Sequence, residues 1–395
     1  MGMRLLLLLT MPAISLLAAS GADPAKAGMT PERLARIPAR MQAFVDKGTA
    51  AGFVTLVARH GQLASLEAVG YQDRESKTPM RTNTIFQIMS MSKPVTGVGI
   101  MILMEQGRLS LLDPVEKHLP EYRGQTMTNG SKPTHPITIR DLMTHTSGMP
   151  GGSPDALKGP RGNWDHTLAE VVAIESQMKL ESEPGLKWRY SNAGIATLGR
   201  IIEVVSGQPF EKFIHDRIFE PLGMKDTFYF LPVDKRSRLA AVYTDDNGVL
   251  KRFTGDRFRE GSKYPAPEGG IYSIATDLAA FYQMMLNHGV LTGRRILSRA
   301  GVDVMTALHT GDIPAGFAPG MGYGLTWSVV REPAGTLRLN SIGAYGHGGA
   351  YRTYGWIDPA KDMLGVILFQ RTNGGGDVAD EINAFMALAA AAVED

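Results

Sequence analysis

Two serines of this 395-residue chain are followed by a lysine three positions later, as Ser90-Met-Ser-Lys93 and as Ser176-Gln-Met-Lys179. Residues three apart on a helix share one face, so each lysine can reach the hydroxyl of its serine. An amine that takes the serine proton turns the hydroxyl oxygen into a nucleophile able to form an acyl intermediate. Because chance gives about one Ser-x-x-Lys pattern in a chain of this length, the surroundings must separate the two.

The surroundings of Ser90 favour it as the nucleophile. It follows the extended apolar run 84–88 and opens a predicted helix from Val95 to Gln106 that is apolar almost all round, so this helix is expected to be buried. Lys93 would then lie partly buried near a helix N-terminus, and both effects disfavour its charged form. Lowering a lysine pKa from about 10.4 to about 7 costs roughly 4.6 kcal/mol of charged-form stability, which only a buried setting supplies.

The surroundings of Ser176 argue against it as the nucleophile. Glu175, Glu181 and Glu183 stand close to it in the sequence. Their carboxylates would keep Lys179 protonated, and a protonated amine cannot accept the serine proton. We therefore expect Ser176 to lie on the solvated face of a helix.

Two further motifs could complete a site around Ser90. Tyr190-Ser191-Asn192 is the only Tyr-x-Asn of the chain and comes just before a predicted amphipathic helix over 194–205. His347-Gly348-Gly349 stands between two predicted strands, where missing side chains let a substrate approach the backbone. His145 is interpreted as stabilising a turn, and Tyr323, Trp327 and Tyr351 as strand aromatics that belong to the core or, alternatively, line a pocket.

The composition removes several other chemistries. The chain has no cysteine, which excludes disulfides, thiolate nucleophiles and cysteine metal sites. None of its nine histidines lies in an H-E-x-x-H arrangement, and no serine has glycine at both the −2 and +2 positions of a nucleophile elbow. The formal net charge of +2 provides no basic footprint for nucleic acid. We expect neither a metal nor any other cofactor.

The first residues are typical of a secretion signal. A short basic start ending at Arg4 precedes the apolar run Leu5 to Leu17, and small residues follow up to Ala22. The run is shorter than the about 20 apolar residues that a spanning helix needs. We therefore predict a signal peptide over 1–22, a secreted or periplasmic protein, and no stable membrane insertion after its cleavage.

Strand patterns occur near both ends of the chain and helical patterns in its middle. The simplest packing is one sheet built from both chain ends and flanked by helices, with an inserted mainly helical lobe. The α/β lobe would comprise 23–105 and 265–395 and the helical lobe 106–264, with the site in the cleft between them. A long surface excursion is expected over 245–267. The predicted strands are 53–58, 64–71, 325–330, 337–342, 351–357 and 363–369, and the predicted helices include 30–47, 168–179, 210–219, 277–286 and 378–393.

Taken in this order, the three motifs resemble those of the serine β-lactamase and penicillin-binding-protein superfamily. The chain looks most like the class C β-lactamase branch, which includes family VIII carboxylesterases and D-stereospecific peptidases. The resemblance runs from roughly Gly52 to the C-terminus, and supporting segments are 107–114, 142–149 and 268–273. It implies an α/β (α+β) fold of the β-lactamase/transpeptidase type, with an antiparallel sheet.

The resemblance also implies roles for individual residues. Ser90 Oγ would be the nucleophile, and Lys93 and Tyr190 would share the proton transfers, with either of them as the acylation base. Asn192 would orient Lys93 or hydrogen-bond a substrate amide. The backbone N–H groups of Ser90 and Ala350, the residue after Gly349, would form the oxyanion hole.

One position departs from the pattern of most β-lactamases and penicillin-binding proteins. They carry Lys-Thr-Gly or Lys-Ser-Gly where this chain has His347, Gly348 and Gly349. A permanent lysine charge there helps to bind a substrate carboxylate, and a neutral imidazole provides less of this attraction. The departure favours an uncharged ester over a β-lactam.

The predicted function is therefore a secreted serine hydrolase that cleaves carboxylic esters or amides of small substrates. Two alternatives within the same chemistry are a D-Ala-type carboxypeptidase or D-aminopeptidase, and a weak β-lactamase. An alternative of another class is a catalytically silent ligand-binding or scaffold protein of the cell envelope.

Overall fold

The computed structural model describes residues 21–158, 161–255, 260–336, 338–373 and 379–394. The predicted signal peptide lies outside these ranges except for its last two residues. Among the described residues, no helix combines the length and apolar character needed to cross a membrane.

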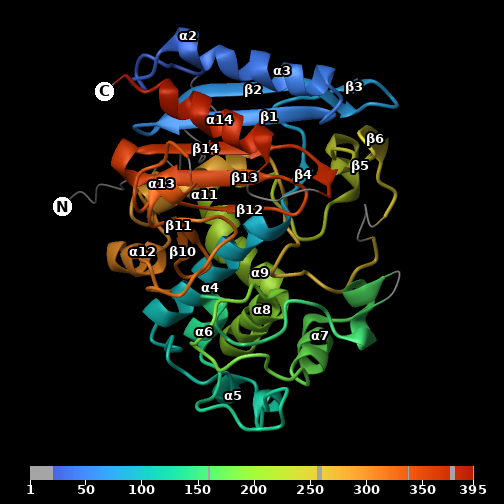
Figure 1. Ribbon diagram of the computed structural model, residues 1–395, viewed down its shortest axis with the longest axis vertical. Coiled ribbons are helices and arrows are strands. Elements are labelled where there is room, and N and C mark those ends of the chain that lie inside the picture. Colours follow the sequence, from blue (N-terminus) through green and yellow to red (C-terminus); the bar gives the residue numbers. More distant parts are fainter. Residues whose placement is uncertain (1–20, 159–160, 256–259, 337, 374–378, 395) are drawn as a thin grey trace, which may run out of the picture.

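An eight-stranded antiparallel sheet forms the centre of the fold, with the strand order β10-β11-β12-β13-β14-β1-β2-β3 (Figure 1). β1, from the N-terminal part of the chain, and β14, from the C-terminal part, pair with each other inside the sheet, with Val54 opposite Leu368 and Arg59 opposite Met363. The predicted fold class is therefore confirmed. The strands are β1 (Gly52–Arg59), β2 (Gln62–Asp73), β3 (Thr78–Pro79), β10 (Met321–Tyr323), β11 (Ser328–Val330), β12 (Tyr345–Gly348), β13 (Tyr354–Asp358) and β14 (Met363–Leu368).

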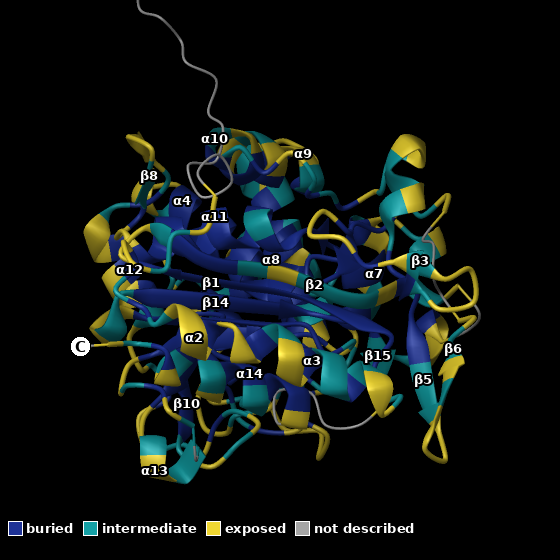
Figure 2. Cartoon of the chain, turned by 90° about the horizontal axis from the view of Figure 1, so that it is seen from above, coloured by how far each residue is buried: buried dark blue, intermediate teal, exposed yellow. Residues whose placement is uncertain are grey.

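Helices cover both faces of this sheet. The terminal helices α2 (Pro31–Leu34), α3 (Arg36–Asp46) and α14 (Asp380–Ala391) lie on one face, and α11 (Ala275–Leu286) packs on the other. Alternate residues of β1 serve the two cores: Phe53 belongs to the cluster under α3 and α14, whereas Val54 belongs to the larger cluster. β1 and β14 are consequently buried along their whole length, as their dark colour in Figure 2 shows, whereas β2 is partly exposed.

Helices dominate the chain between β4 (Phe86–Gln87) and β5 (Tyr243–Asp246). The central one is α4 (Lys93–Glu105), which is buried almost all round as predicted and packs against α8 (Asn192–Ser206). Gly99 permits this close approach, because a Cβ at that position would lie 2.9 Å from Ile202 Cδ1. The other helices here are α5 (Val115–His118), α6 (Ile139–Met143), α7 (Leu168–Glu175), α9 (Phe210–Ile214) and α10 (Glu220–Leu222).

Short strand pairs connect the helical region to the sheet. β4 pairs with β7 (Tyr272–Ser273) just before the Ser90 segment. β5 pairs with β6 (Val249–Arg252) and with β15 (Arg371–Thr372). Part of the predicted surface excursion over 245–267 is therefore a hairpin, and its last residues, 264–267, are buried.

One predicted strand is wrong. Residues 338–342 contain no strand, Leu337 lies outside the described residues, and Leu339 and Ile342 are exposed. The strand forms further on, at β12, whose glycines give the sequence a low β-propensity. Glycine is needed at position 346, because a Cβ there would lie 2.4 Å from Gly355 O on β13. His347 and Gly348 therefore belong to a central strand and not to a turn.

Several predicted helices have different ends. The helix expected over 30–47 is divided at Ala35 into α2 and α3. The one expected over 210–219 continues from α9 as a π-helical turn over His215–Phe219. The last predicted helix begins at Asp380, and residues 374–378 lie outside the described part of the chain. Boundaries of this kind depend on neighbouring packing that a local pattern does not contain.

Candidate active site

Ser90 and Lys93 lie within hydrogen-bonding distance at the start of α4. Ser90 stands in a 3₁₀ turn, Met89–Ser92, that leads directly into Lys93 as the first residue of the helix. Lys93 Nζ donates to Ser90 Oγ at 3.0 Å. Ser90 is half-buried, whereas Lys93 is fully buried. The hydroxyl is thus accessible from outside, while the amine reaches it from inside the protein.

The backbone before Ser90 is held by the C-terminal part of the sheet. Thr353 Oγ1 donates to Ile88 O at 3.0 Å, and Gln370 Nε2 donates to Gln87 O at 3.1 Å. Met89 has a left-handed φ of 51°, a strained conformation for a residue with a side chain and one that recurs at functional sites. These long-range contacts fix the backbone that leads into Ser90.

Lys93 donates three hydrogen bonds in a buried position. Besides Ser90, its acceptors are Asn192 Oδ1 at 2.9 Å and the backbone oxygen of Glu268 at 2.7 Å. Burial lowers the pKa of Lys93 to about 7, and the nearby Glu268 carboxylate opposes this by favouring the charged amine. A substantial fraction of the amine is therefore neutral near pH 7, as a proton acceptor must be.

Tyr190 and Asn192 reach Lys93 from the start of α8. The Tyr190 ring centroid lies 4.7 Å from Lys93 Nζ. Ser191 caps the helix, because its Oγ accepts from Gly194 N at 3.3 Å and donates to Pro150 O at 2.9 Å. The cap fixes the backbone between the two site residues. Of the two roles that the sequence left open for Asn192, the structure shows the contact that orients Lys93.

His347 lies on β12 and is neutral at pH 7. It is 2% exposed, and burial, together with the charge of Lys93, lowers its pKa to about 3. Its Nδ1 lies 2.7 Å from the carbonyl oxygen of Gly348, which can only accept, so Nδ1 carries the hydrogen. Nε2 then accepts from the Tyr323 hydroxyl at 3.0 Å. Both ring nitrogens are thus used inside the protein.

The turn after β12 lies beside the Ser90 segment. A Cβ at Gly349 would lie 2.4 Å from Ile88 O and 2.3 Å from Thr353 Oγ1, so only glycine fits there without a shift. Ala350 follows and is exposed. The predicted oxyanion-hole donors, the backbone N–H groups of Ser90 and Ala350, thus belong to two segments that lie beside each other, and their binding of an oxyanion stays a prediction.

A cluster of aromatic rings surrounds Tyr190, and the sequence did not predict it. His145 lies 4.4 Å from Tyr190 between ring centroids, Phe317 lies 5.0 Å away and Trp188 6.2 Å away. Tyr323 joins the cluster at 5.1 Å from His145. The position of Trp188, two residues before Tyr190, was an available signal. Nothing in the loop sequence around Phe317 indicates its place.

His145 combines the expected turn position with a contact to the site. It has a left-handed φ of 58°, and its Nδ1 accepts from Ser191 N at 3.2 Å. Trp327, in contrast, is fully buried and stacks on Phe281 with ring centroids 6.3 Å apart, so it belongs to the core. The Tyr323 hydroxyl, on β10, contacts the predicted site residue His347. Tyr351 lies in the turn after β12, with its ring centroid 6.5 Å from that of Phe253.

The second Ser-x-x-Lys pattern does not form a comparable pair. The expectation that Ser176 is solvated is wrong: it is 4% exposed and its Oγ donates to Ala173 O at 2.8 Å. The reason is that α7 ends at Glu175, with Ser176 as its C-cap. Lys179 lies beyond the helix and is exposed. The two residues therefore do not share a helical face.

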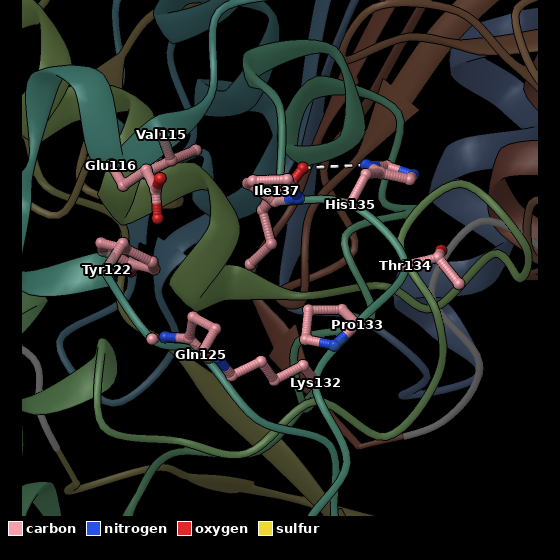
Figure 3. A pocket seen from close by; sticks show the side chains of 11 residues that line it. Val115, Glu116, Tyr122, Gln125, Lys132, Pro133, Thr134, His135 and Ile137 are labelled. Atoms are coloured by element: carbon pink, nitrogen blue, oxygen red, sulfur yellow. Dashed lines mark hydrogen bonds between the residues drawn. The ribbon is translucent and has the colours of Figure 1, made fainter.

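A separate cavity of about 320 Å³ lies beside α5 (Figure 3). Its lining includes Tyr122, Lys132 and His135, and His135 Nδ1 lies 2.9 Å from Pro136 O. None of the predicted site residues borders it. The chemistry described above thus belongs to the junction of α4, α8 and β12, and not to this cavity.

The fold and this junction define a class of protein: a serine hydrolase of the β-lactamase and penicillin-binding-protein type. The chain belongs to the Beta-lactamase family, whose model matches residues 37–390. The resemblance found in the sequence motifs is thereby confirmed.

Individual relatives agree with this assignment. The chain is 32% identical over 365 residues to an uncharacterized protein of Mycobacterium tuberculosis, with 84% of this chain and 88% of that protein covered. It is 30% identical over 374 residues to the esterase EstB of Burkholderia gladioli, with 86% and 91% covered. Among solved structures, EstCE1, described as a hydrolase with promiscuous acyltransferase activity, superposes with a TM-score of 0.77 at 26% identity, covering 92% of this chain and 99% of the other.

Proposed function

We propose that this protein hydrolyses carboxylic esters or amides of small molecules through an acyl-Ser90 intermediate. The observation that carries the proposal is the 3.0 Å contact between Ser90 Oγ and a fully buried Lys93 amine whose pKa is lowered to about 7. A neutral amine next to a serine hydroxyl is the arrangement that activates the nucleophile.

The acylation step follows from the positions of these groups. Ser90 Oγ attacks the substrate carbonyl carbon while its proton passes to the neutral Lys93 amine, either directly or through the Tyr190 hydroxyl, which then gives its own proton to Lys93. The carbonyl oxygen becomes an oxyanion held by the N–H groups of Ser90 and Ala350, and one such donor is worth about 10²–10³ in rate. When the tetrahedral intermediate collapses, the bond to the alcohol or amine breaks and the leaving group takes the proton back.

Deacylation uses the same groups in reverse. Water attacks the acyl carbon and gives its proton to the pair of Lys93 and Tyr190. The acyl–oxygen bond then breaks, and Ser90 Oγ recovers a proton as the carboxylic acid departs. No group outside the described site is needed to balance either step.

An uncharged ester fits the site better than a substrate with a carboxylate. His347 stands where the resemblance implies a lysine, and its imidazole is neutral because its pKa is lowered to about 3. A neutral ring offers a carboxylate no ionic partner. The names of two relatives, the esterase EstB and the hydrolase EstCE1, support the same substrate class.

We also propose that the protein is exported. The support is the basic start and the apolar run Leu5 to Leu17 in the sequence. Expression of the full chain with a C-terminal tag, followed by N-terminal sequencing of the protein outside the cytoplasm, tests this. Intact protein beginning at Met1 and confined to the cytoplasm would contradict it.

The decisive experiment for the catalytic proposal is active-site labelling. A fluorophosphonate probe should label the wild-type protein and the Ser176→Ala control, and should not label Ser90→Ala. Labelling that persists in Ser90→Ala refutes the assignment. A folded wild-type protein that no serine-directed probe labels would favour the silent ligand-binding alternative.

A substrate panel then separates the ester proposal from its neighbours. We expect faster turnover of p-nitrophenyl acetate or butyrate than of nitrocefin, and slow release of D-alanine from a D-Ala-terminated peptide. The opposite order of ester and nitrocefin would restore the β-lactamase interpretation, and preferential D-alanine release would restore the peptidase interpretation.

A further inference from the structure

Trp188, Tyr190 and Phe317 bring their rings together at the site, and we call these three side chains the aromatic wall. The mechanism above uses Tyr190 and gives no role to the other two rings. Phe317 meets Tyr190 edge-on, with ring centroids 5.0 Å apart, and meets Trp188 edge-on at 5.5 Å. Trp188 and Tyr190 lie 6.2 Å apart. Each ring therefore contacts both others at distances favourable for aromatic pairs.

The wall is open to solvent although it is apolar. Phe317 is 51% exposed, and Trp188 and Tyr190 are half-buried. Phe317 also lines a hollow of about 560 Å³, together with neighbours in its own loop and Arg331. A single exposed phenylalanine is unremarkable, but three exposed or half-exposed rings converging beside a nucleophile are an apolar contact surface for a ligand.

Buried groups hold the wall from behind. Tyr323 is fully buried and lies 5.7 Å from Trp188, and His145 is 1% exposed and lies 4.4 Å from Tyr190. Because these supports lie in the core, Trp188 and Tyr190 keep their positions without a substrate. A preformed apolar surface binds a flat or apolar group without a large ordering cost.

The charges near the wall disfavour a substrate that carries a carboxylate. Burial lowers the pKa values of both His145 and His347, so neither imidazole carries a positive charge at neutral pH. Lys93 is buried and its hydrogen bonds go to Ser90, Asn192 and Glu268. Two arginines lie near the wall, but Arg189 pairs with Glu181 and Arg331 pairs with Asp312. A carboxylate on the substrate would therefore lose hydration here and have to compete with these acidic partners.

The position of Tyr190 tells which part of an ester meets the wall. In the mechanism proposed above, Tyr190 or Lys93 returns the proton to the departing alcohol, so that alcohol must lie beside Tyr190. The other two rings pack on Tyr190 itself. We propose that the aromatic wall binds the alcohol portion of the ester and makes the enzyme selective for uncharged aromatic or bulky apolar alcohol groups. This proposal rests on the proposed ester hydrolysis.

The test compares two ratios of kcat/KM. The first is kcat/KM for benzyl acetate divided by that for ethyl acetate, which differ in the alcohol but have leaving groups of similar basicity. The second is kcat/KM for ethyl phenylacetate divided by that for ethyl acetate, which differ in the acyl group. Wild-type enzyme should prefer benzyl acetate, and Phe317→Ala should lower that preference by about fivefold to tenfold, the range expected for loss of one aromatic contact. The acyl ratio should change by less than about twofold, within the spread of effects that do not touch the bound group.

Two further variants and the wild-type rates separate a role of the wall from a general effect of substitution. Phe317→Tyr retains the ring and should keep the benzyl preference, and Phe230→Ala, which removes a 39% exposed phenylalanine elsewhere, should keep both ratios. An unchanged benzyl preference in Phe317→Ala, or a fall in the acyl ratio instead, overturns the role of the wall. If wild-type enzyme hydrolyses none of these esters, the proposed function itself fails, and the wall proposal fails with it.

Discussion

Glu268 contacts the Lys93 amine with its backbone and the Tyr264 hydroxyl with its side chain. Its carbonyl oxygen accepts from Lys93 Nζ at 2.7 Å, while its carboxylate accepts from the Tyr264 hydroxyl at 2.9 Å. Thr96 Oγ1 donates to Pro267 O at 2.8 Å and so fastens this loop to α4. Glu268 thus positions Lys93 through its carbonyl oxygen. The negative charge of its carboxylate favours the charged amine and so opposes part of the lowering of the Lys93 pKa by burial.

Glu268→Gln should shift the pH dependence of catalysis downward. The carboxylate stabilises the charged amine, so its removal should take the pKa of Lys93 below about 7. Activity that requires neutral Lys93 is present above that pKa and lost as pH falls through it, so the acid limb of kcat/KM should move to lower pH. Profiles with p-nitrophenyl butyrate measure this, with Glu260→Gln, on an exposed residue, as the control. An acid limb that stays in place contradicts the electrostatic role.

Lys93→Arg should abolish most of the activity even though it keeps a positive charge. A guanidinium, with a pKa above about 12, stays protonated and cannot accept the proton of Ser90. We expect kcat to fall by about 10²–10⁴, the usual contribution of a proton-transfer group. Lys179→Arg, at the exposed lysine of the other Ser-x-x-Lys pattern, is the matched control. If Lys93→Arg keeps wild-type kcat, the lysine does not take part in proton transfer.

Tyr323→Phe should lower the free energy of unfolding by about 1–3 kcal/mol, because it leaves the buried His347 Nε2 without its donor. Tyr282→Phe is the matched control: the Tyr282 hydroxyl is buried and has no partner among the described residues, so its loss should be close to neutral. Urea unfolding of the two variants measures the difference. Equal stability of both variants would show that the bond to His347 contributes nothing.

Gly349→Ala should impair catalysis through the backbone. The added Cβ would lie 2.4 Å from Ile88 O, so the Ile88 segment before Ser90 and the turn that holds Gly349 must move apart. Small displacements of a reacting group can cost about 10²-fold in rate, and we expect kcat/KM to fall roughly 10–100-fold on that basis. Gly152→Ala, where a Cβ has nothing within 4 Å, should leave kcat/KM unchanged. Wild-type rates in Gly349→Ala would mean that the site tolerates the shift.

The sequence alone was sufficient for the local part of this site. Ser90 and Lys93 are three residues apart, and the apolar run after them already indicates a buried helix, so their pairing needs no distant element. The strand and helix patterns at the two chain ends likewise predict one sheet, because alternation and helical spacing are properties of neighbouring residues. Ser176 and Lys179 show the limit, since the same spacing fails where the helix ends at Glu175, before both of them.

Only the tertiary structure decided which distant groups meet Lys93 and the serine. Asn192 Oδ1 and the backbone oxygen of Glu268 are far from Lys93 in the sequence, and a carbonyl oxygen has no sequence signal at all. Phe317 reaches Tyr190 from a glycine- and proline-containing loop, and β12 forms where glycines lower the strand propensity. Such contacts depend on how whole helices and strands pack against one another. The free energy of packing comes from surfaces that meet only in the folded chain, so a local sequence pattern does not contain it.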